Sequence, residues 1–169
     1  NKNSVASFLE KKAAENRLIK IYLDNWWKET QEEYYKDEPS HYLAYSKVVI
    51  SNWIIKFTFA HMIKRYHLPT KIVEKINYDT PVEQAINIFK DLTEKIDFFT
   101  ILSPIEYSEL IPNNFWRDLT DYNAFLTDQG ISDLPQEVLQ TMLEKSIKGI
   151  RKEIIGQFTT PPKLAEILV

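Results

Sequence analysis

The residues with the clearest chemical potential lie in the stretch 155–169, IGQFTTPPKLAEILV. Gly156 can adopt a left-handed conformation and end a preceding helix, after which Phe158 lies in an extended segment. Thr160 is a typical N-cap, and Pro161 suits the first helical position because its missing N–H is not needed there. The start of such a helix offers free N–H groups and partial positive charge to a carboxylate or phosphate. Physical pattern alone favours the simpler alternative, a capped helix that binds nothing.

A basic run precedes this stretch and consists of Lys145, Lys148, Arg151 and Lys152. Such a run can contact nucleic-acid phosphates. Glu144 and Glu153 are interleaved with it, which is typical of a solvated helix face. The solvated face is the more common interpretation, and the phosphate-contacting strip stays open beside it.

Metal and acid–base chemistry find little support in the pattern. His61 and His67 lie six residues apart on a predicted helix, whereas ligands on one helix face are spaced by three or four. His41, the third histidine, is distant in sequence. The carboxylates sit three or four residues from lysines on polar helix faces. We therefore predict no metal ligand and no catalytic residue.

The aromatic residues allow two interpretations, a base-stacking surface or a set of packing anchors. The residues concerned are Trp26, Trp27, Trp53, Trp116, Tyr34, Tyr35, Tyr42 and Tyr45. Helical spacing favours packing anchors. Trp26 and Trp27 are adjacent and are not expected to face inward together, so one of them is predicted to mark a contact with another domain.

Composition bounds the class of protein. The chain has 169 residues, of which 44% are hydrophobic, and it has a net charge of −3. It contains no cysteine, which excludes disulfides and thiolate metal sites. No run of about 18 apolar residues predicts a membrane span, and residues 1–16 lack a secretory pattern. We expect a cytoplasmic location and no membrane partner.

The dominant period is helical and predicts an all-α fold of six to eight helices. Helices are predicted over about 7–35, 41–67, 78–102, 114–128 and 134–148. The first has a predicted apolar stripe of Phe8, Ala14, Leu18, Ile21, Tyr22 and Trp26. The second is apolar nearly all round, which predicts a central position in the domain.

Helix boundaries are indicated by capping residues. Ser40 is predicted to cap the helix over 41–67. Thr80, Pro81 and Glu83 form a predicted capping box for the helix that follows them. Gly130 is the expected stop of the helix over 114–128.

The stretch IGQFTTPPKLAEILV closely resembles the motif that opens the catalytic domain of adenine-specific DNA methyltransferases of type I and type IIG (type IIS) restriction–modification enzymes. That motif reads Gly-Gln, an aromatic residue, any residue, then Thr-Pro, followed by a helix. LPQEVLQTMLEKSI, residues 134–147, resembles the helix that precedes it. Residues 1–133 resemble, more weakly, the helical region of such enzymes.

The resemblance implies a cofactor and a division into domains. Thr160, Pro161 and Phe158 match positions that hold S-adenosylmethionine, while Thr159 stands where many relatives carry tyrosine. Lys148, Arg151 and Lys152 are the residues expected near DNA. Residues 1–154 are expected to form a helical domain, and 155–169 to begin an incomplete methyltransferase domain.

The family's glycine-rich cofactor loop and its Asn/Asp-Pro-Pro-aromatic tetrad do not occur in these 169 residues. The tetrad holds the flipped adenine, so the chain is expected to be a non-catalytic part of a larger enzyme. It would bind no cofactor alone, and its partners would be methyltransferase and target-recognition domains of its own polypeptide, with DNA. The alternative is a stand-alone helical protein-interaction module.

Overall fold

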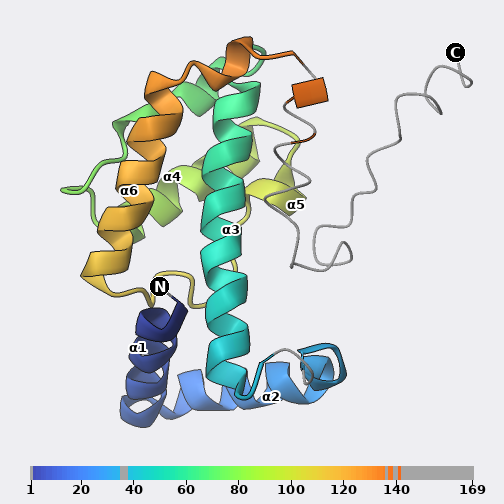
Figure 1. Ribbon diagram of the computed structural model, residues 1–169, viewed down its shortest axis with the longest axis vertical. Coiled ribbons are helices and arrows are strands. Elements are labelled where there is room, and N and C mark those ends of the chain that lie inside the picture. The colour runs from blue at the N-terminus through green and yellow to red at the C-terminus, as the bar shows by residue number, and fades with distance from the viewer. Residues whose placement is uncertain (1, 35–37, 136, 139–140, 142–169) are drawn as a thin grey trace, which may run out of the picture.

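The computed structural model describes residues 2–34, 38–135, 137–138 and 141, and all the secondary structure assigned in these residues is helical (Figure 1). The predicted all-α class is therefore confirmed for this part of the chain. The elements are α1 (Lys2–Glu15), α2 (Arg17–Tyr34), α3 (His41–Ile63), the 3-10 helix η1 (Leu68–Lys75), α4 (Val82–Lys95), α5 (Phe99–Leu102), α6 (Asn113–Asp128) and the 3-10 helix η2 (Ile131–Asp133).

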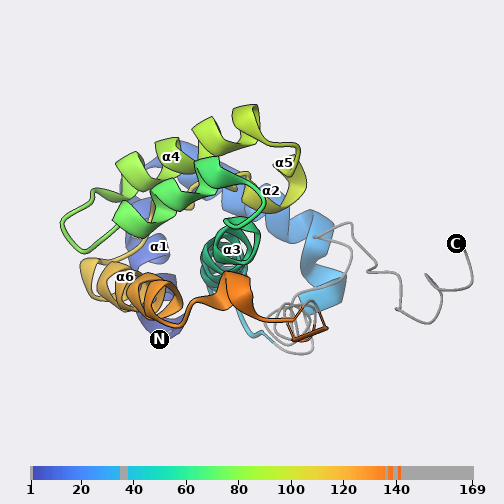
Figure 2. The ribbon, with the colours of Figure 1, turned by 90° about the horizontal axis from the view of Figure 1, so that it is seen from above.

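Helix α3 is the centre of the fold, as its apolar composition predicts. It contacts α1, α2, α5, α6, η1 and η2, and the other helices surround it when the molecule is viewed from above (Figure 2). Trp53 and Phe57 of α3 are fully buried and pack edge-on against Phe89 of α4. A helix with buried residues on several faces needs neighbours on several sides, and α3 has them.

The predicted helix over 7–35 is two helices. Asn16 separates them, and its Oδ1 accepts a hydrogen bond from the Leu18 backbone N–H at 2.9 Å, which caps the start of α2. Helix α2 then crosses beneath α3 at a steep angle (Figure 1). The predicted single apolar stripe is wrong as a result, because Leu18 is 69% exposed while the neighbouring Ile19 and Leu23 enter the core.

The capping predictions have mixed outcomes. Ser40 caps α3 as predicted, since its Oγ accepts from the Leu43 N–H at 3.2 Å. Gly130 follows α6 with φ +56°, a left-handed conformation that glycine adopts readily. The capping box at Thr80 is wrong, because Thr80 Oγ1 accepts from the Asn77 N–H at 3.0 Å and Pro81 precedes the first turn of α4.

The predicted helix over 78–102 is divided as well. Helix α4 ends at Lys95, where Ile96 turns to an extended conformation, and the single turn α5 follows. The break allows Leu92 and Ile96 of the first part and Ile101 of the second to enter the core from different directions. In the described part of the chain, no helix is both long and apolar enough to cross a membrane.

Candidate functional site

The residues predicted for the cofactor site and the DNA contact lie outside the described residues. These are Phe158, Thr160, Pro161, Lys148, Arg151 and Lys152. The boundary predicted at 154/155 lies outside them too. The groups available for chemistry in the structure are therefore those that the helices gather between residues 2 and 138.

Lys56 is the most unusual titratable group among them. It lies in the middle of α3, its side chain is fully buried, and its Nζ has no hydrogen-bond partner. The ammonium group lies 4.3 Å from the centre of the Trp53 ring and 5.3 Å from that of Phe89. Burial lowers the pKa of Lys56 from 10.5 to about 7. Sequence reasoning did not single it out, although a lone lysine inside the apolar run 48–63 is a visible signal.

A lysine with a lowered pKa can act as a nucleophile or base if a substrate reaches it. Three clefts, between α4 and the loop 104–109, between α4 and α1, and between α3 and the segment 99–105, are lined by other residues, so none of them leads to Lys56. Its aromatic neighbours provide cation–π contacts that offset part of the cost of burying the ammonium group. The arrangement makes Lys56 a structural group whose ionisation is coupled to folding.

A buried polar network links α3, α6 and the end of η1. Asn123 of α6 donates from Nδ2 to the carbonyl oxygens of Val73 and Ile76, each at 2.8 Å. Its Oδ1 lies 2.8 Å from His61 Nε2 of α3. Because both amide hydrogens are used by carbonyl groups, Oδ1 must be the acceptor and His61 Nε2 the donor. This fixes the tautomer of His61 with an unprotonated Nδ1, which has no partner.

The electrostatics of this network keep His61 neutral. Burial is the main cause that lowers the pKa of His61, and the nearby ammonium group of Lys64 lowers it further, while Asn123 and Glu74 act in the opposite direction. Lys64 forms an ion pair with Glu74 at 2.8 Å, and that bond lowers the pKa of Glu74. His67, by contrast, packs edge-on against Phe98. The two histidines thus have separate structural roles.

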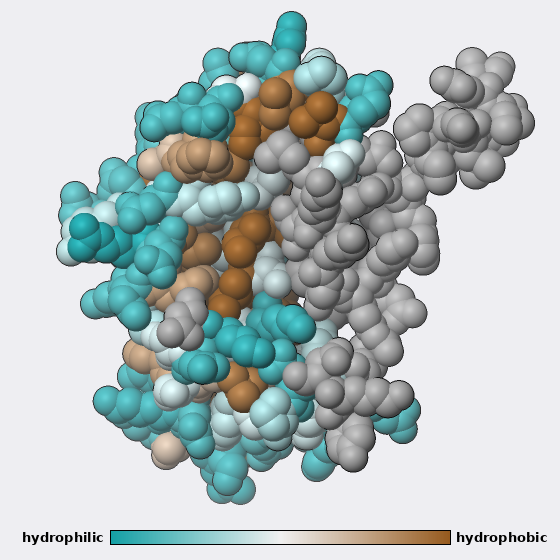
Figure 3. All heavy atoms as spheres, in the orientation of Figure 1, coloured by the Kyte–Doolittle hydropathy of each residue, from teal (hydrophilic) through white to brown (hydrophobic). Residues whose placement is uncertain are grey.

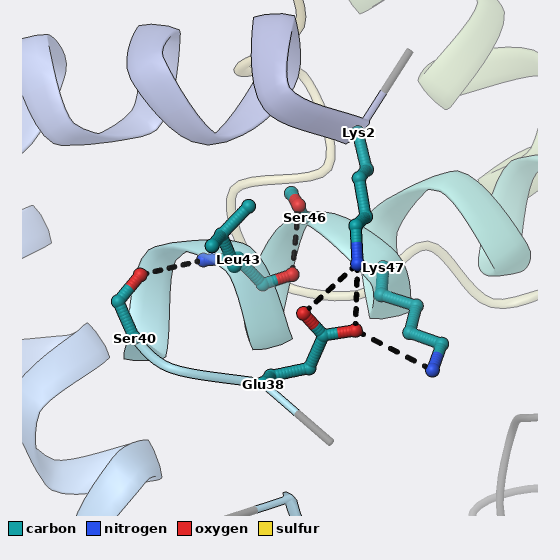
Figure 4. Close-up of polar contacts among 6 residues, drawn as sticks. All are labelled: Lys2, Glu38, Ser40, Leu43, Ser46 and Lys47. Atoms are coloured by element: carbon teal, nitrogen blue, oxygen red, sulfur yellow. Dashed lines mark hydrogen bonds and ion pairs between the residues drawn. The ribbon is translucent and has the colours of Figure 1, made fainter.

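A second set of charged residues, Glu38 with Lys2 and Lys47, lies where the start of α1 meets the start of α3 (Figure 4). The Glu38 side chain is only 2% exposed, and its two carboxylate oxygens accept from Lys2 Nζ at 3.0 and 3.1 Å. Lys47 of α3 lies 3.5 Å from the same carboxylate. The carboxylate therefore joins the start of α1 to α3 beside the cap made by Ser40.

We expect Glu38→Gln to lower the free energy of unfolding by about 1–2 kcal/mol, because charge-assisted hydrogen bonds are replaced by weaker ones. Lys2 and Lys47 are partly exposed and can rehydrate, which limits the loss. Urea unfolding measures the change. Glu15→Gln is the matched control: it removes the exposed Lys12–Glu15 pair, and such pairs contribute little. Equal losses in both variants would contradict a special role of Glu38.

The tryptophans serve packing. Trp53 and Trp116 are buried with ring centres 5.2 Å apart, and each donates its indole N–H to a backbone carbonyl, of Ser108 and Thr80 respectively. Trp26 and Trp27 are both half-buried, contrary to the expectation that only one faces inward. Trp26 packs against Tyr45 and Trp27 lies beside His41, because the start of α3 crosses over α2 and covers both.

Two polar clefts adjoin the start of α4. One, of about 370 Å³, lies between α4 and the loop 104–109, and the other, of about 530 Å³, extends towards α1. Glu83 and Glu109 line both clefts. Around the pair, carboxylates (Asp79, Glu83, Glu106, Glu109) outnumber ammonium groups (Lys12, Lys90). Such a surface repels nucleic-acid phosphates, so this face is unsuited to a DNA contact.

The described residues contain no group of three or more histidine, cysteine, aspartate or glutamate side chains arranged to hold a metal ion. Among the buried polar groups of this part of the molecule, Glu38 and Asn123 bind other side chains or backbone, whereas Lys56 Nζ and His61 Nδ1 have no hydrogen-bond partner, and the clefts lack a nucleophile next to a base. What the geometry defines is an all-helical domain with a polar network in its core. Comparison with known proteins adds no relative: no family model, curated protein or solved structure matches the chain.

Proposed function

We propose that this chain is a helical connector domain of a restriction–modification enzyme that methylates adenine in DNA with S-adenosylmethionine. The observation that carries the proposal is the motif Gly156–Pro161, with the apolar pattern of a helix after it. A helical domain with its own core, placed directly before that motif, fits the role of positioning a catalytic domain. The connector itself would be non-catalytic.

The proposal gives the residues before and after position 154 different roles. Phe158, Thr160 and Pro161 would contribute to the cofactor site of the following domain. Lys148, Arg151 and Lys152 would lie near DNA phosphates, and the acidic clefts at α4 would face away from the DNA.

The first experiment is to read the gene beyond the codon for Val169. The proposal requires a glycine-rich loop and an Asn-Pro-Pro-aromatic or Asp-Pro-Pro-aromatic tetrad within about one domain length, roughly 100–200 residues. A frame that continues without them, or stops, would reject it. In that case a helical protein-interaction module is the better candidate, and the exposed Leu18 and Ile21 on one side of α2 favour this second function.

Cofactor binding provides the quantitative prediction. The 169-residue chain should bind no S-adenosylmethionine in calorimetry, and micromolar binding would contradict the assignment of most of the pocket to another domain. In the full-length protein, Thr160→Ala should weaken binding about tenfold, because one hydrogen bond to a charged ligand contributes about 1.5 kcal/mol. Thr159→Ala is the control and should leave the affinity nearly unchanged.

A further inference from the structure

The buried ammonium group of Lys56 lies between the central helix and α4. Two aromatic rings contact it: the ring of Trp53 on the same helix, with its centre 4.3 Å from Nζ, and the ring of Phe89 on α4, at 5.3 Å. The side chain of Lys56 is fully buried, and its Nζ has no hydrogen-bond partner. Cation–π contacts replace only part of the hydration that an ammonium group loses on burial. Outward movement of Phe89 would therefore let water reach Nζ.

No opposite charge compensates the ammonium group of Lys56. Burial alone lowers its pKa, without a contribution from a charged neighbour. On α3 itself, the buried His61 bonds to Asn123 and Lys64 pairs with Glu74. Helix α5 carries no charged residue. The charged residues on α1, η1, α4, α6 and the adjoining loops are exposed or half-exposed, namely Glu10, Lys11, Lys12, Glu15, Lys71, Glu74, Lys75, Glu83, Lys90, Asp91, Glu94, Lys95, Asp97, Glu106, Glu109, Arg117, Asp118, Asp121 and Asp128.

Helix α4 is attached to α3 through large side chains. The backbone of α1 packs closely along α3, whereas the backbone of α4 packs closely against α5 and η1. The Phe89 ring of α4 reaches α3, with its centre 6.0 Å from that of Trp53 and 5.6 Å from that of Phe57. Pro81 precedes α4 in a non-helical conformation, and the extended Ile96 follows it. A segment bounded by two such breaks is suited to open locally before the rest of the domain unfolds.

The position of α4 leaves room for this movement. It lies on the far side of α3 in the view of Figure 1, and at the outer edge of the molecule when seen from above (Figures 1 and 2). On the near side of α3, a hydrophobic strip is visible in the middle of the face seen in Figure 3. Opening of α4 would add the rings of Trp53 and Phe57, which are fully buried in the closed state, to the apolar surface of the domain.

We propose that α4 is a pH-gated flap: protonation of Lys56 favours a state in which α4 has moved away from α3 and water reaches the ammonium group. The neutral amine favours the closed state, because it loses less hydration on burial. The inference does not depend on the proposed function, since it concerns only α3, α4 and the aromatic rings between them.

The equilibrium constant for opening should rise as the pH falls. The pKa of Lys56 is about 7 in the closed state, against 10.5 for a hydrated lysine. The open state therefore binds more protons between these values, and its equilibrium constant should increase about fiftyfold from pH 9 to pH 7.

Thiol labelling measures this constant, because the chain contains no cysteine of its own. Ala85→Cys places a thiol at a buried position of α4, and Ala13→Cys is the matched variant on α1. Each labelling rate is divided by that of the same variant unfolded in urea at the same pH, which removes the titration of the thiol itself. At pH 7 we expect Ala85→Cys to be labelled at least tenfold faster than Ala13→Cys. The opening constant from Ala85→Cys should fall about fiftyfold at pH 9.

Two lysine variants test whether Lys56 controls the opening. Added to Ala85→Cys, Lys56→Met should make the opening constant equal at pH 7 and pH 9. Lys90→Met, at an exposed position of α4, should keep the full change. Hydrogen exchange of the α4 amides in the wild type at both pH values repeats the measurement without any substitution.

Each of three results would overturn the proposal. Equal labelling of Ala85→Cys and Ala13→Cys would show that α4 opens only when the whole domain unfolds. An opening constant that does not change with pH, or that changes equally in Lys56→Met, would show that another group controls the opening. Wild-type α4 amides as well protected as those of α1 at pH 7 would show that the added thiol causes the opening.

Discussion

Asn123→Ala should lower the free energy of unfolding by about 4 kcal/mol, since three buried groups each lose a hydrogen bond to this side chain, at about 1–3 kcal/mol per bond. The groups are the carbonyl oxygens of Val73 and Ile76 and the Nε2–H of His61, and of these the Val73 carbonyl keeps a second bond, from the Ile76 N–H at 3.1 Å. Asn123 is 1% exposed. In the alanine variant, water can bond to the groups that the amide leaves only if the space that remains is large enough to hold a water molecule. A denaturant midpoint that falls by about 2 M urea would correspond to this loss.

The control for this prediction is Asn114→Ala, on the same helix. Asn114 is exposed, and its side chain bonds to Ser4 Oγ, through Nδ2 at 3.3 Å and Oδ1 at 3.4 Å. We expect a change within about 0.5 kcal/mol there, as for most surface substitutions. If Asn123→Ala costs no more than the control, ordered water must satisfy the two carbonyl groups, and the network is not what joins η1 to α6.

The second large effect is a rise in stability with pH that depends on Lys56. The pKa of Lys56 is lowered in the folded state to about 7 from 10.5, so folding disfavours the charged form. The unfolded chain therefore binds more protons between these two values, and stability rises as pH rises through that window. We expect the wild type to gain about 2 kcal/mol between pH 7 and pH 9.

Other buried groups with a shifted pKa affect stability outside the range from pH 7 to pH 9. The lowered pKa of His61 affects stability only near and below its unfolded pKa of 6.5. Burial raises the pKa of Tyr34 and Tyr45 above 10, so their contribution is lost only as the pH rises beyond that value. Between pH 7 and pH 9, Lys56 should dominate the pH dependence.

Lys56→Met should remove this pH dependence and raise stability at pH 7 by about 3 kcal/mol. Methionine keeps much of the volume and flexibility of the lysine stem without a charge to desolvate. Chemical unfolding at pH 7, 8 and 9 measures both effects. Lys11→Met, at an exposed position, should leave the pH profile unchanged. A methionine variant that follows the wild-type profile would show that Lys56 is hydrated or charged in the folded protein.

The sequence by itself determined the class of fold and the central helix. The all-α class follows from a helical period over most of the chain and from only three glycines. The position of α3 follows from a run that is apolar on nearly every face. Ser40 and Gly130 were predictable as boundaries because a capping hydroxyl and a left-handed glycine act through their immediate neighbours. The motif at 156–161 is likewise visible only in the sequence.

Tertiary structure decided the features that depend on the direction in which a helix runs or a side chain points. The break at Asn16 turns α2 away from α1, so Leu18 faces solvent although it continues the apolar spacing of the first helix. The Thr80 hydroxyl accepts from the preceding Asn77 N–H and does not cap α4, while its carbonyl accepts from Trp116 of another helix. The roles of Lys56 and Asn123 were likewise not predictable from the sequence. Each is an ordinary polar residue in the sequence, and only packing against distant helices removes it from water and makes its charge or hydrogen bonds matter to stability.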